Sequence, residues 1–272
     1  MSTLKYFFDV KNAEENRKLF KDLHIEKSEY FKEQGQYPVI FISLKDLKKN
    51  IWEDAFFELK ALLREVYEEH SYVKEKLSDI EKEEYDKILM KTDDAEYGRA
   101  LRNLTKYLHT YYQKEVVLLI DEYDNPLIVA NTFNYYKEGI NFFRDFFSTA
   151  LKTNPYLKTA VLTGIVQVAK EGIFSGLNNV ITYNILKDKF ETFFGLSEEE
   201  VEEALKYFEM EYQIEEVKKW YDGYKFGDKE IYNPWSILNY LSNGKLQAYW
   251  VNTSDNALIY ENLSVANMDV FN

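Results

Sequence analysis

The sequence predicts an α/β fold in which a mostly parallel sheet carries helices on both faces. Two apolar runs, 39–44 and 116–120, the second without a break, have the composition of strands that are buried on both sides. Two further β-rich runs follow at 159–163 and 180–185, and helical stretches separate the first three. Because strands connected through helices make right-handed crossovers, we expect all four to lie parallel in one sheet.

Helical periodicity accounts for most of the remaining chain. We expect helices at about 4–11, 12–23, 50–70, after 78, after 93, at 134–151, 197–208 and 214–221, and from 234 up to Gly244. Four of them start at a capping-box pattern: Asn50 with Glu53, Ser78 with Glu81, Asp93 with Glu96, and Ser197 with Glu200. Residues 224–232 suggest a small hairpin. The chain is therefore divided into a core at 1–190, with a helical insertion at about 50–114, and a mainly helical subdomain at 191–272.

Composition and charge narrow the classes of function. The 272 residues carry a net charge of −13, which argues against general attraction to nucleic acid or to anionic membranes. No apolar run approaches the length of a membrane span. The absence of cysteine excludes disulfides and fits a reducing compartment, so a cytoplasmic location is expected. The three histidines are too scattered for a zinc site.

The second apolar run ends on two acids, Asp121 and Glu122. Ligands of parallel sheets bind beyond the carboxyl ends of the strands. In a P-loop ATPase the first acid at such an end holds Mg²⁺ and the second polarises the attacking water. The alternative is a strand that leaves the core through a polar turn at Asn125 and Pro126. Two explanations are also open for Thr163, at the end of the third run. It can sense a γ-phosphate, or it can simply end a strand.

Four stretches, taken in order, resemble the prokaryotic AAA-ATPase-like family. They are the strand with Asp121-Glu122-Tyr123-Asp124, then 161–165, 173–179, and 220–227 with 232–236. The resemblance covers nearly the whole chain and implies a P-loop NTPase-like fold of AAA/RecA type, often followed by a PD-(D/E)XK nuclease-like domain. It implies ATP binding and Mg²⁺-dependent hydrolysis, with Asp121 as the Mg²⁺ ligand, Glu122 as the base and Thr163 as the sensor.

The sequence departs from this family in three places. The G-x-x-x-x-G-K-[ST] phosphate loop does not occur in the 272 residues, and the family's loop would lie upstream of Met1. Gln167 stands where the family usually has an arginine. The nuclease-like domain is missing after Asn272. We therefore expect an ATPase-like core without its central loop strand, with unpaired sheet edges and with impaired or absent ATPase activity.

Two other classes of function compete with a truncated ATPase. One is a catalytically inert interaction module that keeps the fold and binds a protein, with Trp220, Tyr221, Tyr224 and Trp235 on its surface. Ordinary core packing is the favoured explanation of these four aromatic residues. The other is a nuclease, for which Asp228-Lys229-Glu230 supplies no convincing motif. The expected partners are ATP in the full-length parent and, for the inert module, a protein. Neither nucleic acid nor a membrane is indicated.

Overall fold

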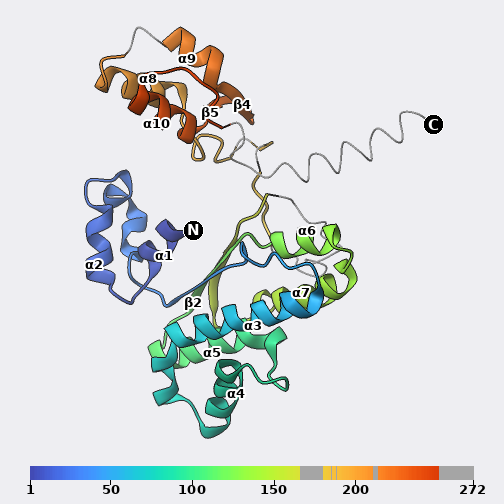
Figure 1. Ribbon diagram of the computed structural model, residues 1–272. Helices are drawn as coiled ribbons and strands as arrows, with labels where there is room; N and C mark the ends of the chain where they lie inside the picture. Colours follow the sequence, from blue (N-terminus) through green and yellow to red (C-terminus); the bar gives the residue numbers. More distant parts are fainter. Residues whose placement is uncertain (166–179, 185, 188, 211–213, 251–272) are drawn as a thin grey trace, which may run out of the picture. The chain divides into compact units, whose positions relative to one another are not determined.

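The computed structural model describes residues 1–165, 180–184, 186–187, 189–210 and 214–250 (Figure 1). The chain divides into two compact units, Met1–Asn179 and Val180–Asn272. Among the described residues, no helix is both long and apolar enough to cross a membrane. Each unit is described by itself below.

The first unit is built on a three-stranded parallel sheet. Its strands are β1 (Val39–Ser43), β2 (Val116–Asp121) and β3 (Leu157–Leu162), in the order β1-β2-β3. Leu118 of β2 pairs with Ile40 on one side and with Ala160 on the other. Since the first five residues of β2 are fully buried, the central strand has the continuous apolar composition that a covered parallel sheet requires.

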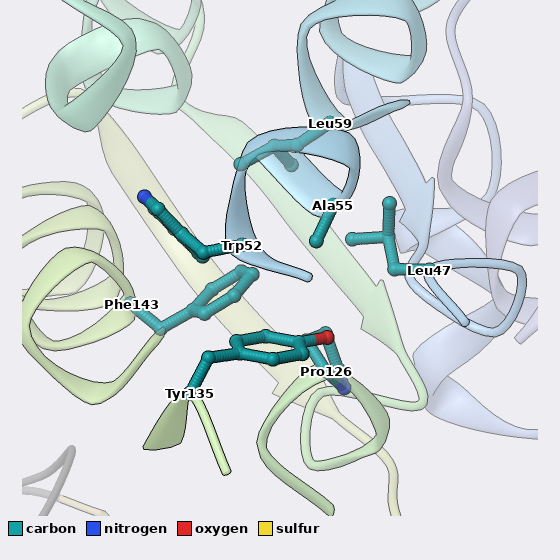
Figure 2. Close-up of a pocket in the computed structure, with 7 residues that line it drawn as sticks. All are labelled: Leu47, Trp52, Ala55, Leu59, Pro126, Tyr135 and Phe143. Carbon is teal, nitrogen blue, oxygen red and sulfur yellow. The ribbon is translucent and has the colours of Figure 1, made fainter. Parts of the chain in front are cut away.

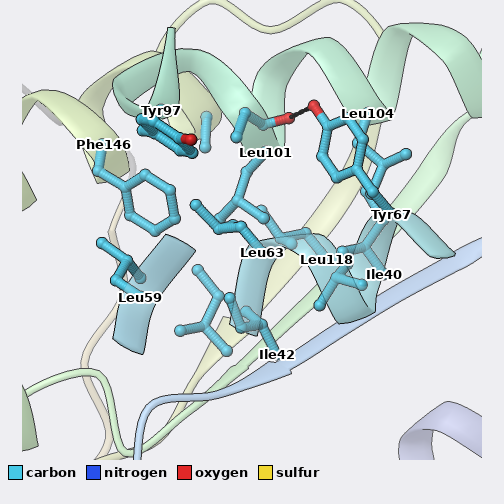
Figure 3. Close-up of a cluster of buried hydrophobic side chains, with 14 of the residues drawn as sticks. Ile40, Ile42, Leu59, Leu63, Tyr67, Tyr97, Leu101, Leu104, Leu118 and Phe146 are labelled. Carbon is cyan, nitrogen blue, oxygen red and sulfur yellow. Dashed lines mark hydrogen bonds between the residues drawn. The ribbon is translucent and has the colours of Figure 1, made fainter. Parts of the chain in front are cut away.

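One face of the sheet carries α3 (Trp52–Glu69), α5 (Ala100–Tyr112) and α7 (Tyr136–Leu151), as Figure 1 shows. Leu59 and Leu63 of α3, four residues apart, point into the same core as Leu118 (Figure 3). Tyr67, also in α3, is fully buried, and its hydroxyl donates a hydrogen bond of 2.8 Å to the carbonyl of Ala100 at the start of α5. The phenol is thus satisfied inside an otherwise apolar core.

The opposite face is covered by the amino-terminal helix α1 (Ser2–Phe8). Leu4 and Phe8 pack with Met1 against a buried cluster formed by Val39 and two residues of β2. Helices therefore lie on both faces of the sheet, as the sequence predicts. The next helix, α2 (Ala13–Arg17), continues into a 3₁₀ turn at Lys18–Phe20.

The described part of the first unit contains two further α-helices. The first, α4 (Asp79–Met90), begins with the predicted capping box, in which Ser78 and Glu81 exchange side-chain and backbone hydrogen bonds. The second, α6 (Asn125–Thr132), follows β2 directly and has proline in its first turn. That helix occupies the place where the sequence suggested only a turn at Asn125 and Pro126. Proline is well suited to the first turn of a helix because it has no N–H to leave unpaired there.

The second unit packs three helices around a small hairpin. These are α8 (Glu198–Tyr207), α9 (Ile214–Tyr221) and α10 (Pro234–Asn243), with β4 (Asp222–Phe226) and β5 (Lys229–Tyr232) antiparallel. Ser197 and Glu200 form the predicted capping box, and Asn233 caps α10. Val201, Val217 and Ile237, one from each helix, are fully buried together. The predicted helices, the hairpin and the helix end at Gly244 are all confirmed.

Two predictions of secondary structure are wrong in the described residues. Residues 180–184 form no strand, because a β-rich segment needs a neighbour to pair with and no described strand lies beside it. Residue 185 and the segment 166–179, which includes Gln167, lie outside the described residues. The predicted helix at 12–23 is short: the chain turns at Asp22, where φ is +63°, and Leu19 and Leu23 are exposed. Only Phe20 of this stretch is buried, with its ring centroid 5.3 Å from that of Phe7.

Two predicted capping boxes are also absent. Ile51, in an extended conformation, precedes the first turn of α3, which places Glu53 at the second helical position, out of step with Asn50. A 3₁₀ turn at Tyr97–Arg99 precedes α5, so that this helix begins at Ala100, well after Asp93. Capping boxes are thus formed where the helix starts directly after the serine, and lost where the start shifts by one residue or more.

Candidate functional site

The carboxyl ends of β2 and β3 bring together two of the three predicted site residues. The Thr163 hydroxyl donates a hydrogen bond to Oδ1 of Asp121. Backbone bonds hold both residues in place: the Thr163 N–H donates to the carbonyl of Ile120 (3.0 Å), and the Leu44 N–H donates to the carbonyl of Asp121 (2.9 Å). Hydrogen bonds from the residues after β1 and after β3 therefore hold the end of β2 in place. The Asp121 carboxylate lies at the edge where ligands of parallel sheets bind.

Glu122 begins a sharp change of direction after the strand. Its φ is +56°, in the left-handed region that costs about 1–3 kcal/mol for a residue with a side chain. The turn lets the Tyr123 N–H donate to the carbonyl of Thr163 (2.9 Å), so that the two strand ends stay joined beyond the ladder. Asn125 N–H then donates to the Glu122 carbonyl (3.1 Å) as α6 begins.

The electrostatics of this strand end favour a proton on Glu122. Partial burial, and then the charges of Asp124 and Asp121, raise the pKa of the Glu122 carboxyl above its usual value. Lys48 and Lys45, in the loop after β1, act in the opposite direction. A carboxyl with a raised pKa is better matched to proton transfer near neutral pH than an ordinary glutamate.

Asp124 and Gly164 form a close contact that sequence reasoning missed. Asp124 is fully buried, and a Cβ built on Gly164 would lie 2.6 Å from its Cγ and closer still to Oδ1. Only glycine lets the end of β3 approach this carboxylate. The sequence signal was present in the last acid of Asp-Glu-Tyr-Asp and in the glycine after Thr163, although neither residue by itself distinguishes a buried contact from a turn.

Asn125 is a second residue at this edge, and the sequence indicated it only as part of a possible turn. Its side-chain N–H donates to the carbonyls of Leu44 (2.9 Å) and Lys45 (3.1 Å). These bonds tie the first residue of α6 to the loop that follows β1. The ends of all three strands are therefore connected: β1 to β2 through Asn125, and β2 to β3 through Thr163.

A small apolar cavity lies behind this edge. Figure 2 shows Trp52, Tyr135 and Phe143 gathered about it, together with Pro126 of α6. Its volume is about 10 Å³, too little for any nucleotide. The Tyr135 hydroxyl donates to the carbonyl of Lys49 (2.8 Å). The cavity is thus a packing gap that supports the strand ends, and the chemistry belongs to the polar edge itself.

The oxygen atoms of Asp121 and Thr163 at this edge are suitable as part of a Mg²⁺ site. Mg²⁺ prefers hard oxygen ligands and is commonly held by one or two carboxylates together with phosphate and water. The Asp121 carboxylate and the Thr163 hydroxyl are ligands of that kind, and they are in contact. Among the residues that the structure describes, no group of three histidine or acidic side chains is arranged to hold a metal ion. These two oxygen atoms can supply only part of the coordination shell of a Mg²⁺ ion, and the described residues do not form an all-protein cage.

Comparison with known proteins gives the family. The model of a family described as predicted AAA-ATPase, AAA-ATPase-like, matches residues 1–174, which include the whole described sheet and its polar edge. The chain belongs to this family. It is also similar to an uncharacterized protein in the vnfD 5' region of Azotobacter chroococcum mcd 1, with 25% identity over 163 residues, or 58% of this chain. The chain spans 30% of the length of that relative. No solved structure matches.

Proposed function

We propose that this chain carries the metal-and-water half of an ATP site, and that the parent activity is ATP binding with Mg²⁺-dependent hydrolysis. The observation that supports this most directly is the hydrogen bond from Thr163 to Asp121 at adjoining strand ends of a family member. Since Ile120 pairs with Leu162, the register makes Asp121 and Thr163 neighbours, and the hydrogen bond shows that the hydroxyl is directed at the carboxylate. Asp121 would hold Mg²⁺ together with the nucleotide, and Thr163 would sense the terminal phosphate.

Glu122 is assigned the role of general base. It follows Asp121 directly, and its raised pKa places proton uptake nearer to neutral pH. Its left-handed backbone is the kind of strain that functional sites store. When bound, Mg²⁺ would neutralise phosphate charge.

The phosphate-binding half of the site is assigned to a further strand beside β3. The resemblance implies a central strand that ends in a Gly-Lys-Thr loop, and the 272 residues contain no such loop. In the described sheet, β3 has a neighbour on one edge only. A strand added to its outer edge would place its loop next to Thr163, because parallel strands end at the same side of a sheet.

The 272 residues by themselves should therefore bind ATP weakly. Micromolar affinity requires about 8 kcal/mol, most of which a phosphate loop normally supplies through its backbone N–H groups and lysine. Two adjacent carboxylates repel the nucleotide phosphates rather than bind them. A catalytically inert interaction module is the alternative for this chain, and the exposed aromatic residues of the second unit favour it.

The test compares the chain with an extended protein, in which the family's strand and Gly-Lys-Thr loop are added before Met1. In the extended protein, Asp121→Asn should weaken Mg-ATP binding because the metal loses an anionic ligand, whereas Asp46→Asn, in the loop after β1, serves as a control at another acid. Equilibrium binding with and without Mg²⁺ separates the two. Equal Mg-ATP affinities for Asp121→Asn and its parent would refute the assignment. An extended, folded protein that does not bind ATP would favour the inert module.

A further inference from the structure

Asn125 connects the turn that carries Glu122 to the loop after β1. Its side-chain amide donates to the carbonyl of Leu44 (2.9 Å) and to that of Lys45 (3.1 Å). Asn125 is the first residue of α6, and its backbone N–H donates to the carbonyl of Glu122 (3.1 Å). One residue therefore contacts both the segment of the assigned base and the end of the neighbouring strand.

The segment 121–125 is fastened at both ends to the same residue. Leu44 donates its N–H to the carbonyl of Asp121 (2.9 Å), and its own carbonyl accepts the Asn125 side chain. Only residues 122–124 lie between these two attachments, and Glu122 is the first of them. The left-handed conformation of Glu122, with φ of +56°, is thus enclosed in a short turn that Asn125 closes.

The loop after β1 is a firm support for this attachment. Leu44 is fully buried, and Leu47 is 3% exposed. The carbonyl of Lys49 accepts the Tyr135 hydroxyl at 2.8 Å. Because the loop is anchored to the core at these points, the two side-chain bonds of Asn125 hold the turn against a fixed part of the fold.

The bonds to the loop explain why asparagine suits position 125. The first turn of a helix favours acidic side chains, since the helix dipole places partial positive charge there. An aspartate at this position would direct a carboxylate at two carbonyl oxygens, whereas the asparagine amide supplies two N–H donors. The residue type therefore matches the contact with Leu44 and Lys45 better than it matches the start of α6.

We propose that Asn125 is a positioning residue for Glu122. By closing the turn 121–125 on Leu44, it holds the Glu122 carboxyl where that group can take a proton from the attacking water. This inference rests on the proposed function, in which Glu122 is the general base. A displacement of about 1 Å can lower the rate of a catalysed step by about 10²-fold. Because Asn125 acts through Glu122 and not through the nucleotide, its loss should slow hydrolysis far more than it weakens binding.

Asn154 provides a matched control at the opposite ends of the strands. Like Asn125 it is half-buried, and its side-chain amide makes two bonds, to the carbonyl of Ala150 (2.8 Å) and to the hydroxyl of Thr105 (2.9 Å). It precedes β3, whereas Asn125 follows β2. Asn154→Ala therefore removes bonds of the same kind without altering the turn at Glu122.

The first measurement is amide hydrogen exchange in the 272-residue chain. The Tyr123 N–H, inside the turn, donates to the carbonyl of Thr163 (2.9 Å). In Asn125→Ala this N–H should exchange about tenfold faster than in the parent, because the released end of the turn can open locally. Asn154→Ala should leave it unchanged. Unchanged exchange in a folded Asn125→Ala protein would show that the turn does not depend on the asparagine, and would overturn the proposal.

The second measurement uses the extended protein and separates a positioning role from a structural one. Asn125→Ala should lower kcat by about 10–100-fold and leave the KM for Mg-ATP within about twofold of the parent, whereas Asn154→Ala should change neither. In a Glu122→Gln background, Asn125→Ala should cause no further loss, because the group that it positions is already absent. Asn125→Ser keeps a hydroxyl donor and should have an intermediate kcat. It replaces Asn125→Ala if that variant unfolds, as judged by circular dichroism.

The outcomes distinguish this inference from the proposed function. If Glu122→Gln hydrolyses ATP as fast as its parent, Glu122 is not the base and both fail. If Glu122→Gln is slow but a folded Asn125→Ala protein keeps the kcat of the parent, only this inference fails. A further loss from Asn125→Ala in the Glu122→Gln background, as large as in the parent, would mean that the asparagine acts on another step and would also overturn the proposal.

Discussion

The two outer strands of the sheet, β1 and β3, differ although each has β2 as its only neighbour among the described strands. In β1, Val39, Ile40 and Ile42 are at most 2% exposed. The start of this strand is shielded by the chain after α1, where the Val10 N–H donates to the carbonyl of Tyr37 (2.8 Å) and the Tyr37 N–H donates to that of Phe8 (3.0 Å). The chain that leads into β1 is thus paired with the residues that follow α1.

The other edge is left open in the described unit. Lys158 and Thr159 of β3 are exposed, and Ala160, Val161 and Leu162 are only half-buried, although their partners in β2 are fully buried. Natural sheets usually protect an edge with charges, proline, bulges or a covering segment. In β3, Lys158 provides a charge of this kind, and residues 160–162 are apolar. The difference between the two strands indicates that β3 is suited to an additional neighbour, in agreement with the proposed loop strand.

The largest expected effect concerns the chemistry at this edge. In the extended protein, Glu122→Gln should leave Mg-ATP binding nearly intact and slow hydrolysis by about 10²–10⁴-fold, because glutamine keeps the shape but cannot take the proton. Steady-state phosphate release, measured beside equilibrium binding, provides the two values. If the variant hydrolyses ATP as fast as its parent, Glu122 is not the base.

A matched pair of substitutions tests the two strands directly. Val39 and Val161 belong to the same cluster on the same face of the sheet, but Val39 is 2% exposed and Val161 is half-buried. We expect Val39→Ala to lower the free energy of unfolding by about 2–3 kcal/mol, and Val161→Ala by about 1 kcal/mol or less. Urea denaturation measures both.

The same pair becomes more informative in the extended protein. If a strand covers the outer edge of β3, Val161 becomes a core residue, and its replacement by alanine should cost nearly as much as that of Val39. Equal costs already in the 272-residue chain would show that the two strands do not differ. A small cost for Val161→Ala in the extended protein would show that the added strand lies elsewhere.

The sequence predicted the parts of this comparison that depend on local pattern. The run at 116–120 is uninterrupted because β2 is buried on both faces, and its position was predicted correctly. The strand predicted at 180–185 was not found in its described residues, because pairing depends on a neighbour that composition does not reveal. The helix after Asp124 was not predicted, and a turn was considered there only as an alternative, since Asn125 and Pro126 suit either structure. The contact between Asp124 and Gly164 joins residues 40 positions apart, which no local pattern encodes.

A smaller effect is expected where β2 and β3 are held together. Gly164→Ala should destabilise the protein by about 1–3 kcal/mol, because the added methyl group collides with the buried Asp124 carboxylate. Gly98→Ala is the matched control, since a Cβ at that position meets no atom within 4 Å. Thermal unfolding of the two variants compares them. A Gly164→Ala protein as stable as Gly98→Ala would mean that the strand end and Asp124 separate without cost.

The smallest expected effect concerns Asp9, in the segment between α1 and β1. Burial raises the pKa of Asp9 to about 6, against the opposing influence of the Lys11 backbone N–H and the Lys5 charge. A raised pKa means that the folded state holds this proton more tightly, so stability is lost as the pH rises from about 4 through 6. Asp9→Asn removes that loss and should raise Tm above pH 6, by about 2–4 °C for each kcal/mol gained.

Below about pH 3 the Asp9→Asn variant and its parent should have the same Tm, since Asp9 is then protonated in both the folded and unfolded states. His70, whose pKa burial lowers to about 4, is common to both proteins, and so its contribution largely cancels. A difference in Tm that does not vary with pH would assign the effect of the substitution to packing instead of charge.

The central claim is that the 272 residues hold one half of an ATP site and that a strand on the open edge of β3 supplies the other. Isothermal calorimetry with Mg-ATP tests it most directly, on the chain as it stands and on the extended protein with the Gly-Lys-Thr loop. We expect no micromolar binding by the first and micromolar or tighter binding by the second, a gain of several kcal/mol from the added loop. Micromolar binding by the 272-residue chain alone would contradict the account, as would an extended and folded protein that binds no nucleotide.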